Sequence, residues 1–227
     1  MPTHNRYRLI TFDVYTALFD VEGSLTPIVR DVVGPYIDAL ALMRTWRRKQ
    51  LEYALISNSL QQGRVPFRQI TQRALDYALA QADVSVTQAT QQNFIQAWFV
   101  LRPWPEVPEV LKAVKAKDYS IGLLSNGDSD MLNALRDRLP PVIDHVFASE
   151  QVGHYKPHPS VYALPLQTLR LAANDMLHVA GSATDVMGTK AAGLSCAWSN
   201  RRQERVLDPQ LQADHEFADL NGLLEIL

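Results

Sequence analysis

The chain has 227 residues, enough for one large domain or for a core that carries an insertion. Its 22 basic and 24 acidic residues leave a net charge of −2, which lacks the basic excess that a nucleic-acid partner needs. The single cysteine, Cys196, excludes an intramolecular disulfide. No stretch approaches the ~20 apolar residues of a membrane span, and the N-terminus shows no signal-peptide pattern, so we expect a cytoplasmic protein without membrane contact.

Short apolar runs, bounded by polar residues or glycine, recur along the chain. Runs of this length are typical of buried parallel strands, and helical patterns separate the later ones. The alternation predicts an α/β fold with a parallel sheet covered by helices on both faces. The expected strands are residues 8–15, 119–126, 144–149, 176–181 and 194–199, and the expected helices between them are residues 107–118, 129–139, 160–172 and 184–193.

About a hundred residues separate the first expected strand from the second. An ordinary α/β connection takes about 2–6 residues, so this segment has a structure of its own. Apolar residues at three- and four-residue spacing predict helices at residues 36–56, 70–82 and 89–101. We therefore expect a helical cap at residues 20–103, inserted after the first strand, and a core made of residues 1–19 and 104–227.

Polar residues stand at the ends of three expected strands. Asp13 ends the first, Ser125 and Asn126 end the second, and Ser182 and Asp185 follow a later one. Ligands of open α/β sheets bind beyond the carboxyl ends of the strands, so these side chains are expected to share one site. A helical cap at the same edge would exclude water from it.

Lys156 precedes a proline-rich turn, in which Pro157 and Pro159 restrict the backbone. A lysine on such a turn is better positioned than one on a flexible loop, and near Asp13 it would favour the ionised carboxylate. Each residue also has a simpler interpretation. Taken alone, Lys156 could be a solvated surface lysine. Asp13 could cap the turn after the first strand, and Asp185 could cap the helix that follows it.

Taken together, these residues resemble the haloacid dehalogenase-like hydrolase superfamily, and within it the L-2-haloacid dehalogenases. The segment "FDVYTALFD" (12–20) resembles their "FDVYGTLFD", and "WRRKQLEY" (46–53) resembles their cap sequence. "SNG" (125–127), "YKPHPSVY" (155–162) and "DVMG" (185–188) match further motifs. The likeness covers almost the whole chain and implies a Rossmann-like core with a helical cap after the first strand.

The resemblance also bears on metal binding. Phosphatases of the superfamily carry an acid two residues after the nucleophile and another four residues before the late aspartate. Here these places hold Tyr15 and Gly181. Without the two carboxylates a hard divalent cation has too few oxygen ligands. We therefore expect neither metal nor cofactor, and we expect Asp13 to act as a nucleophile toward carbon.

The resemblance implies an (S)-2-haloacid dehalogenase that acts on a small 2-substituted carboxylate. Asp13 would displace the halide with inversion to form an aspartyl ester, and water would open the ester to a 2-hydroxy acid. Lys156 and Asp185 would complete the catalytic set. The expected substrate-binding residues are Val14, Tyr15, Arg47, Ser125, Asn126, Tyr162 and Ser182. Arg47 and Asn126 would bind the departing anion, and Ser125 with N–H groups near Val14 and Tyr15 would bind the substrate carboxylate. Tyr162 would orient the lysine–aspartate cluster.

Some positions depart from the dehalogenase pattern. The family's Gly-Thr pair becomes Thr16 and Ala17, and a serine and an asparagine become Ala180 and Ser182. Thr16 and Ser182 keep hydrogen-bonding capacity near the lost groups. The changes leave three alternatives: ring opening of azetidine-2-carboxylate, a catalytically inactive relative that binds a small carboxylate, and a metal-dependent phosphatase. Relatives are commonly dimers, and the long first cap helix is a candidate interface for a homodimer.

Overall fold

A six-stranded parallel sheet forms the centre of the protein, in a computed structural model that describes residues 6–60 and 63–227. The strand order is β5-β4-β1-β6-β7-β8. The strands are β1 (Leu9–Phe12), β4 (Ser120–Ser125), β5 (His145–Ala148), β6 (Met176–Ala180), β7 (Ser195–Ser199) and β8 (His215–Phe217). Residues 1–5, which belong to the stretch considered for a signal peptide, lie outside the described residues.

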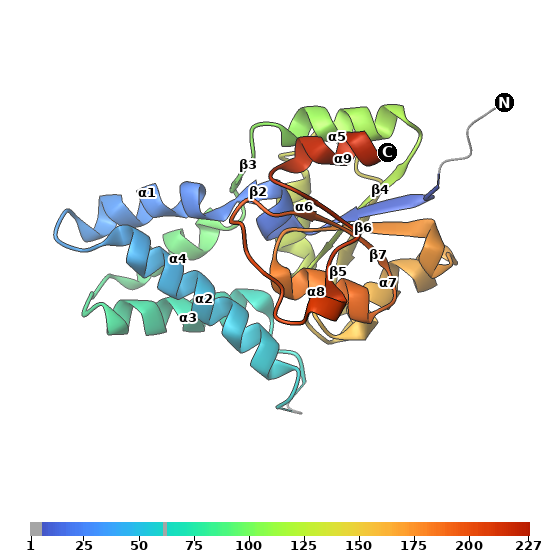
Figure 1. The fold of residues 1–227 in the computed structure, drawn as a ribbon. Coiled ribbons are helices and arrows are strands. Elements are labelled where there is room, and N and C mark those ends of the chain that lie inside the picture. Colours follow the sequence, from blue (N-terminus) through green and yellow to red (C-terminus); the bar gives the residue numbers. More distant parts are fainter. Residues whose placement is uncertain (1–5, 61–62) are drawn as a thin grey trace.

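Helices cover both faces of the sheet. On one side lie α5 (Val107–Ala116) and α9 (Leu223–Ile226), and on the other lie α7 (Pro159–Leu169) and α8 (Ala183–Ala191) (Figure 1). The helix α6 (Ser129–Arg136) connects β4 to β5. All residues of β1 and β6 are buried, because these central strands lie between two layers of helices. The predicted α/β class with a parallel sheet is confirmed.

Four further helices lie together at the end of the sheet (Figure 1). They are α1 (Val21–Val33), α2 (Ala39–Ser57), α3 (Phe67–Gln81) and α4 (Gln88–Ala97). The segment starts and ends at a two-stranded antiparallel ribbon, in which β2 (Phe19–Asp20) pairs with β3 (Arg102–Pro103). The ribbon lies at the predicted limits of the cap, and the division into cap and core stays a prediction.

A continuous apolar cluster joins the sheet to these four helices. It contains Phe12 and Leu123 from the sheet together with Trp46, Phe67 and Trp98 from the helical segment. All five side chains are fully buried. Because burial of large apolar side chains is the main stabilising contribution to folding, the two parts are held together by a shared interior.

The main local difference from the prediction concerns residues 13–15. The first strand ends at Phe12 rather than at residue 15, and Val14–Leu18 form a π-helical turn capped by Asp13. The Asp13 side chain accepts a hydrogen bond from the Thr16 N–H, and such local bonds compete with strand pairing. In the described part of the chain, no helix is long and apolar enough to cross a membrane.

Candidate active site

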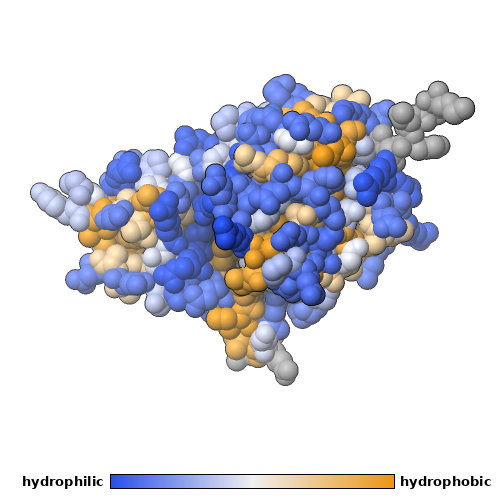
Figure 2. Space-filling view, viewed as in Figure 1, coloured by the Kyte–Doolittle hydropathy of each residue, from blue (hydrophilic) through white to orange (hydrophobic). Residues whose placement is uncertain are grey.

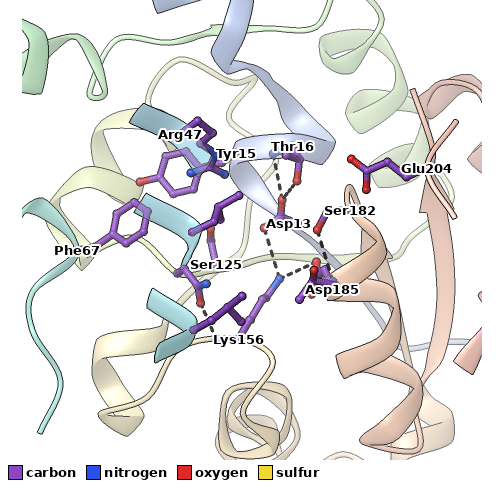
Figure 3. A pocket seen from close by; sticks show the side chains of 14 residues that line it. Asp13, Tyr15, Thr16, Arg47, Phe67, Ser125, Lys156, Ser182, Asp185 and Glu204 are labelled. Carbon is purple, nitrogen blue, oxygen red and sulfur yellow. Dashed lines mark hydrogen bonds and ion pairs between the residues drawn. The ribbon is translucent and has the colours of Figure 1, made fainter. Parts of the chain in front are cut away.

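Asp13 lies where the order of the strands changes direction. The chain runs from β1 to its neighbour β4 on one side and returns later to β6 on the other, which makes the carboxyl end of β1 a topological switch point. The Asp13 side chain faces a cavity of about 180 Å³ (Figure 3). Among the predicted site residues, those that line this cavity are Asp13, Tyr15, Arg47, Ser125, Asn126, Lys156, Ser182 and Asp185. The sequence therefore predicted residues that the fold brings together.

The two oxygens of the Asp13 carboxylate have different surroundings. Oδ2 accepts hydrogen bonds from the Thr16 backbone N–H at 3.0 Å and from the Thr16 hydroxyl at 2.5 Å. Oδ1 lies 3.5 Å from the Lys156 ammonium. The hydroxyl of Thr16 thus reaches the nucleophile candidate, as expected from its place beside the lost hydroxyl at residue 17.

Lys156 and Asp185 form a buried ion pair behind Asp13. Lys156 Nζ donates to Asp185 Oδ2 at 3.0 Å, and the Tyr162 hydroxyl donates to Asp185 Oδ1 at 2.8 Å. Burial alone would raise the pKa of Asp185, but Lys156 and His178 together hold this pKa well below its ordinary value. Asp185 is therefore a carboxylate at neutral pH.

Tyr162 and Val14 do not line the cavity, although both were predicted to bind substrate. Tyr162 is fully buried, and the contact of its hydroxyl is with Asp185. Gly188 makes this contact possible, because a Cβ at that position would lie 2.3 Å from the Tyr162 hydroxyl oxygen. Tyr162 thus contacts Asp185 of the lysine–aspartate cluster, and its orienting role stays a prediction.

Arg47, from α2, supplies a cation at the opposite wall. Its guanidinium carbon lies 5.4 Å from the centroid of the Tyr15 ring and 5.5 Å from that of Trp98, and Nη1 donates to Gln50 Oε1 at 2.5 Å. Burial lowers the pKa of Arg47 to about 10, partly opposed by Asp13, so the group remains charged at neutral pH. A weakly hydrated cation between aromatic faces suits a large, polarisable anion.

Two buried hydroxyls in the cavity wall lack partners in the described part of the chain. They are Ser125 Oγ, at the end of β4, and the Tyr15 hydroxyl. Buried polar atoms are normally hydrogen-bonded, so a bound ligand is the natural partner for Ser125 Oγ. The Tyr15 hydroxyl instead lies beside Gly127, on the side of the ring away from Asp13 (Figure 3). Asn126 has a different contact, because its Oδ1 accepts the Lys156 backbone N–H at 2.7 Å and so fixes the lysine turn.

A family model for haloacid dehalogenase-like hydrolases matches residues 7–193. The chain belongs to this family. The (S)-2-haloacid dehalogenase of Pseudomonas sp. (strain YL) is 30% identical to it over 219 residues, which cover 96% of this chain and 93% of that relative. The (S)-2-haloacid dehalogenase 4A of Burkholderia cepacia is 29% identical, with 96% and 93% covered.

The similarity to dehalogenases extends from the sequence to the three-dimensional structure. A solved L-2-haloacid dehalogenase superposes with a TM-score of 0.92 at 26% identity, covering 98% of this chain and 99% of that one. The L-2-haloacid dehalogenase of Xanthobacter autotrophicus with covalently bound chloropropionic acid gives a TM-score of 0.86 at 25% identity, covering 97% and 98%. The predicted superfamily and its Rossmann-like fold are confirmed.

Two positions that carry acids in the family's phosphatases hold other residues in this chain. Tyr15 and Gly181 occupy the positions at which the resemblance places the two further acids. The two carboxylates that remain, Asp13 and Asp185, both face the ammonium of Lys156. Across residues 6–60 and 63–227, no group of three or more His, Cys, Asp or Glu side chains is arranged to hold a metal ion. A metal-free reaction stays a prediction.

The sequence did not reveal His178, on β6. This fully buried residue places Nε2 at 3.0 Å from Asp185 Oδ2 and 3.2 Å from Lys156 Nζ, while Nδ1 lies 2.9 Å from Thr11 Oγ1. Burial, together with the charge of Lys156, lowers the pKa of His178, so it is neutral at neutral pH. A histidine inside the otherwise apolar strand "MLHVA" was the available signal. Leu55, Phe67, Thr184 and Glu204, which also line the cavity, carry no comparable signal.

The mouth of the cavity is apolar on the side of α2. Leu51 and Leu55 line the cavity and are partly exposed, and Ile56 and Leu60 continue the exposed apolar residues along the chain. Figure 2 shows apolar surface over this lower end of the helical segment. A small organic acid with an alkyl group therefore meets apolar surface at the entrance and charged groups inside.

Proposed function

We propose that this hydrolase is an (S)-2-haloacid dehalogenase, which converts a small 2-haloalkanoic acid into the 2-hydroxy acid and halide. The observation that carries the proposal is the Asp13 carboxylate, which faces a cavity between the Lys156–Asp185 pair and the partly buried cation of Arg47. Relatives of nearly the same length are named (S)-2-haloacid dehalogenases, which supports the same reaction.

In the first half of the reaction, Asp13 Oδ1 attacks the carbon that bears the halogen. The new carbon–oxygen bond forms as the carbon–halogen bond breaks, and the halide leaves with the bonding electron pair. Arg47 binds the departing anion, with Asn126 as a second donor. Ser125 satisfies its missing hydrogen bond on the substrate carboxylate, together with N–H groups near Val14 and Tyr15.

In the second half, water attacks the carbonyl carbon of the aspartyl ester. The bond between Cγ and the ester oxygen breaks, which releases the 2-hydroxy acid and regenerates the Asp13 carboxylate. Asp185, kept ionised by Lys156, orients the water, and Ser182 lines the cavity beside it. Lys156 supplies the positive charge near Asp13 in both halves, so the proposed reaction uses no metal.

The alternatives predict different chemistry at the same groups. Ring opening of azetidine-2-carboxylate requires a proton for the amine leaving group, and nothing among the described residues favours that reaction over halide displacement. A catalytically inactive binding protein would tolerate loss of the Asp13 charge, whereas the proposed enzyme requires it. A cytoplasmic location and a homodimer stay predictions.

The test is chloride release from (S)-2-chloropropionate in the presence of EDTA, with the Asp13→Asn variant beside the wild type. We expect release by the wild type and a loss of at least about a thousandfold in the variant, because the nucleophile is removed. Equal release by both proteins, or no release by the wild type, would contradict the proposal. Loss of wild-type release in EDTA would contradict its metal-free form.

A further inference from the structure

We propose that Thr16 forms the oxyanion hole for hydrolysis of the aspartyl ester, through its backbone N–H and its hydroxyl. The inference rests on the proposed function, since it assigns a catalytic residue to the second half of that reaction. It concerns the residue that stands between Tyr15 and Ala17 in this chain, where the resemblance gives no functional residue.

The geometry distinguishes the two carboxylate oxygens before substrate binds. Both donors of Thr16 converge on Asp13 Oδ2, at 3.0 Å for the N–H and 2.5 Å for the hydroxyl (Figure 3). Oδ2 accepts these two short hydrogen bonds, whereas Oδ1 has one longer contact, 3.5 Å from the Lys156 ammonium, so Oδ1 is the less constrained and better nucleophile. Oδ1 therefore becomes the ester oxygen, and Oδ2 remains as the carbonyl oxygen, still facing Thr16.

Charge then develops at the oxygen that Thr16 already contacts. The oxygen of water forms a bond to Cγ, and the carbonyl π-electron pair moves onto Oδ2. The pair returns as the bond between Cγ and Oδ1 breaks, and the alkoxide of the 2-hydroxy acid takes one proton of the water. The other proton is released when the new carboxyl group ionises. Donors that point at Oδ2 in the resting enzyme stabilise this intermediate without reorganisation.

The surroundings of Thr16 hold it in this position. Thr16 lies in the π-helical turn capped by Asp13, and its main chain packs against Gly181 at the end of β6. A Cβ at residue 181 would lie 2.6 Å from Thr16 Oγ1 and 2.3 Å from the Ala17 nitrogen. Glycine at 181 thus makes room for the threonine side chain beside the nucleophile.

The test separates the two halves of the reaction by rapid quenching of a single turnover with (S)-2-bromopropionate. Bromide release reports ester formation, and the mass of the peptide that carries Asp13 reports the ester. In Thr16→Val, which keeps the branched shape but removes the hydroxyl, we expect a full bromide burst and an ester that accumulates. Hydrolysis should slow by about a hundredfold to a thousandfold, the usual effect of losing one oxyanion-hole donor. Thr16→Ser should restore hydrolysis to within a few-fold of the wild type.

Two further variants test the position of Thr16 and the specificity of the substitution. Gly181→Ala leaves Thr16 chemically intact but displaces it, so the ester should accumulate there as well. Thr168→Val makes the same chemical change on the exposed side of α7 and should behave as the wild type. An unchanged rate of ester hydrolysis in Thr16→Val, or equal slowing of both halves, would overturn the inference alone. A wild type that releases no bromide would overturn the proposed function and this inference with it.

Discussion

Arg47 is a partly buried cation that lies against the rings of Tyr15 and Trp98. Burial favours its neutral form and so lowers its pKa to about 10, far below that of an exposed arginine. Below this pH the guanidinium is charged and can receive an anion, and above it the charge is lost. The neighbouring Tyr15 does not titrate in this range, because burial raises its pKa well above the ordinary value of a tyrosine.

We therefore predict that kcat/KM for (S)-2-chloropropionate falls as the pH rises through about 10. The measurement is a pH–rate profile of chloride release in buffers of constant ionic strength. Arg47→Gln should be slower at every pH and should lack this alkaline decline, which assigns the decline to Arg47. A wild-type profile that stays flat to pH 11, or a decline that persists in Arg47→Gln, would contradict the assignment.

The Tyr162 hydroxyl donates a hydrogen bond to a buried charge, the carboxylate of Asp185. Tyr162→Phe should lower the free energy of unfolding at pH 7 by about 1.5–3 kcal/mol, the range for a hydrogen bond to a charged group. Urea denaturation measures this difference. The control is Tyr77→Phe, at a half-exposed ring on α3, for which we expect less than about 0.5 kcal/mol. Equal effects of the two substitutions would show that the Tyr162 hydroxyl adds nothing.

The residues of the site differ in how far the sequence could predict them. Asp13, Ser125 and Asp185 could be predicted because each follows or ends a strand, and parallel strands bring their carboxyl ends to one edge. His178 could not, because its contacts depend on strand register, in which it pairs with Thr11 across β6 and β1. The choice of Oδ2 rather than Oδ1 as the oxygen that accepts the Thr16 hydrogen bonds likewise depends on a π-helical turn, which no sequence periodicity predicts.

At the scale of elements, α3 depends on a residue from another part of the chain. Pro66 precedes this helix and supplies no side-chain cap. Asp128, after β4, accepts hydrogen bonds from the first N–H groups, those of Phe67 and Arg68, at 2.9 Å each, and pairs with Arg64 at 2.7 Å. A carboxylate at a helix N-terminus satisfies free donors and interacts favourably with the helix dipole. The interaction ties α3 to the edge of the sheet beside the cavity.

Asp128→Ala should therefore lower the free energy of unfolding by about 1–3 kcal/mol, because it leaves these N–H groups without their acceptor and Arg64 without its carboxylate partner. It should also raise KM, since Phe67 lines the cavity. Urea denaturation and steady-state kinetics measure the two effects. The control is Asp130→Ala, two residues after Asp128, which removes the exposed ion-pair partner of Arg68. It should change the free energy of unfolding by less than about 0.5 kcal/mol. A similar effect of both substitutions would refute the special role of Asp128.

Elements whose apolar residues recur at a regular spacing could be predicted from the sequence, and the others could not. The expected helix at residues 36–56 is α2 (Ala39–Ser57), since its apolar face is regular. The helix α1 was missed because Gly23 and Pro27 interrupt its helix-forming signal, although its buried residues keep helical spacing. The strand β8 was missed because "HEF" is short and partly polar. Packing against neighbours, rather than local preference, forms such elements.

At the scale of the whole molecule, the helical segment and the sheet form the two walls of the site. They share an apolar interior, and Asn58 after α2 exchanges two hydrogen bonds of 2.9 Å with the backbone of Tyr155, next to Lys156. The long gap between the first two strands predicted an insertion at this edge. The contacts that close it could not be predicted, because they join residues about a hundred positions apart without a sequence pattern. The arrangement places Arg47 of one wall opposite Asp13 of the other.

The central claim is that the oxygen delivered to the product comes from Asp13 and not directly from water. It is tested by a single turnover of (S)-2-chloropropionate in H₂¹⁸O, with enzyme in excess over substrate. We predict 2-hydroxypropionate whose hydroxyl oxygen is ¹⁶O, and one ¹⁸O atom in the peptide that contains Asp13, because water attacks Cγ of the ester. A product that carries ¹⁸O in this first turnover would show direct attack of water on the substrate and would contradict the account.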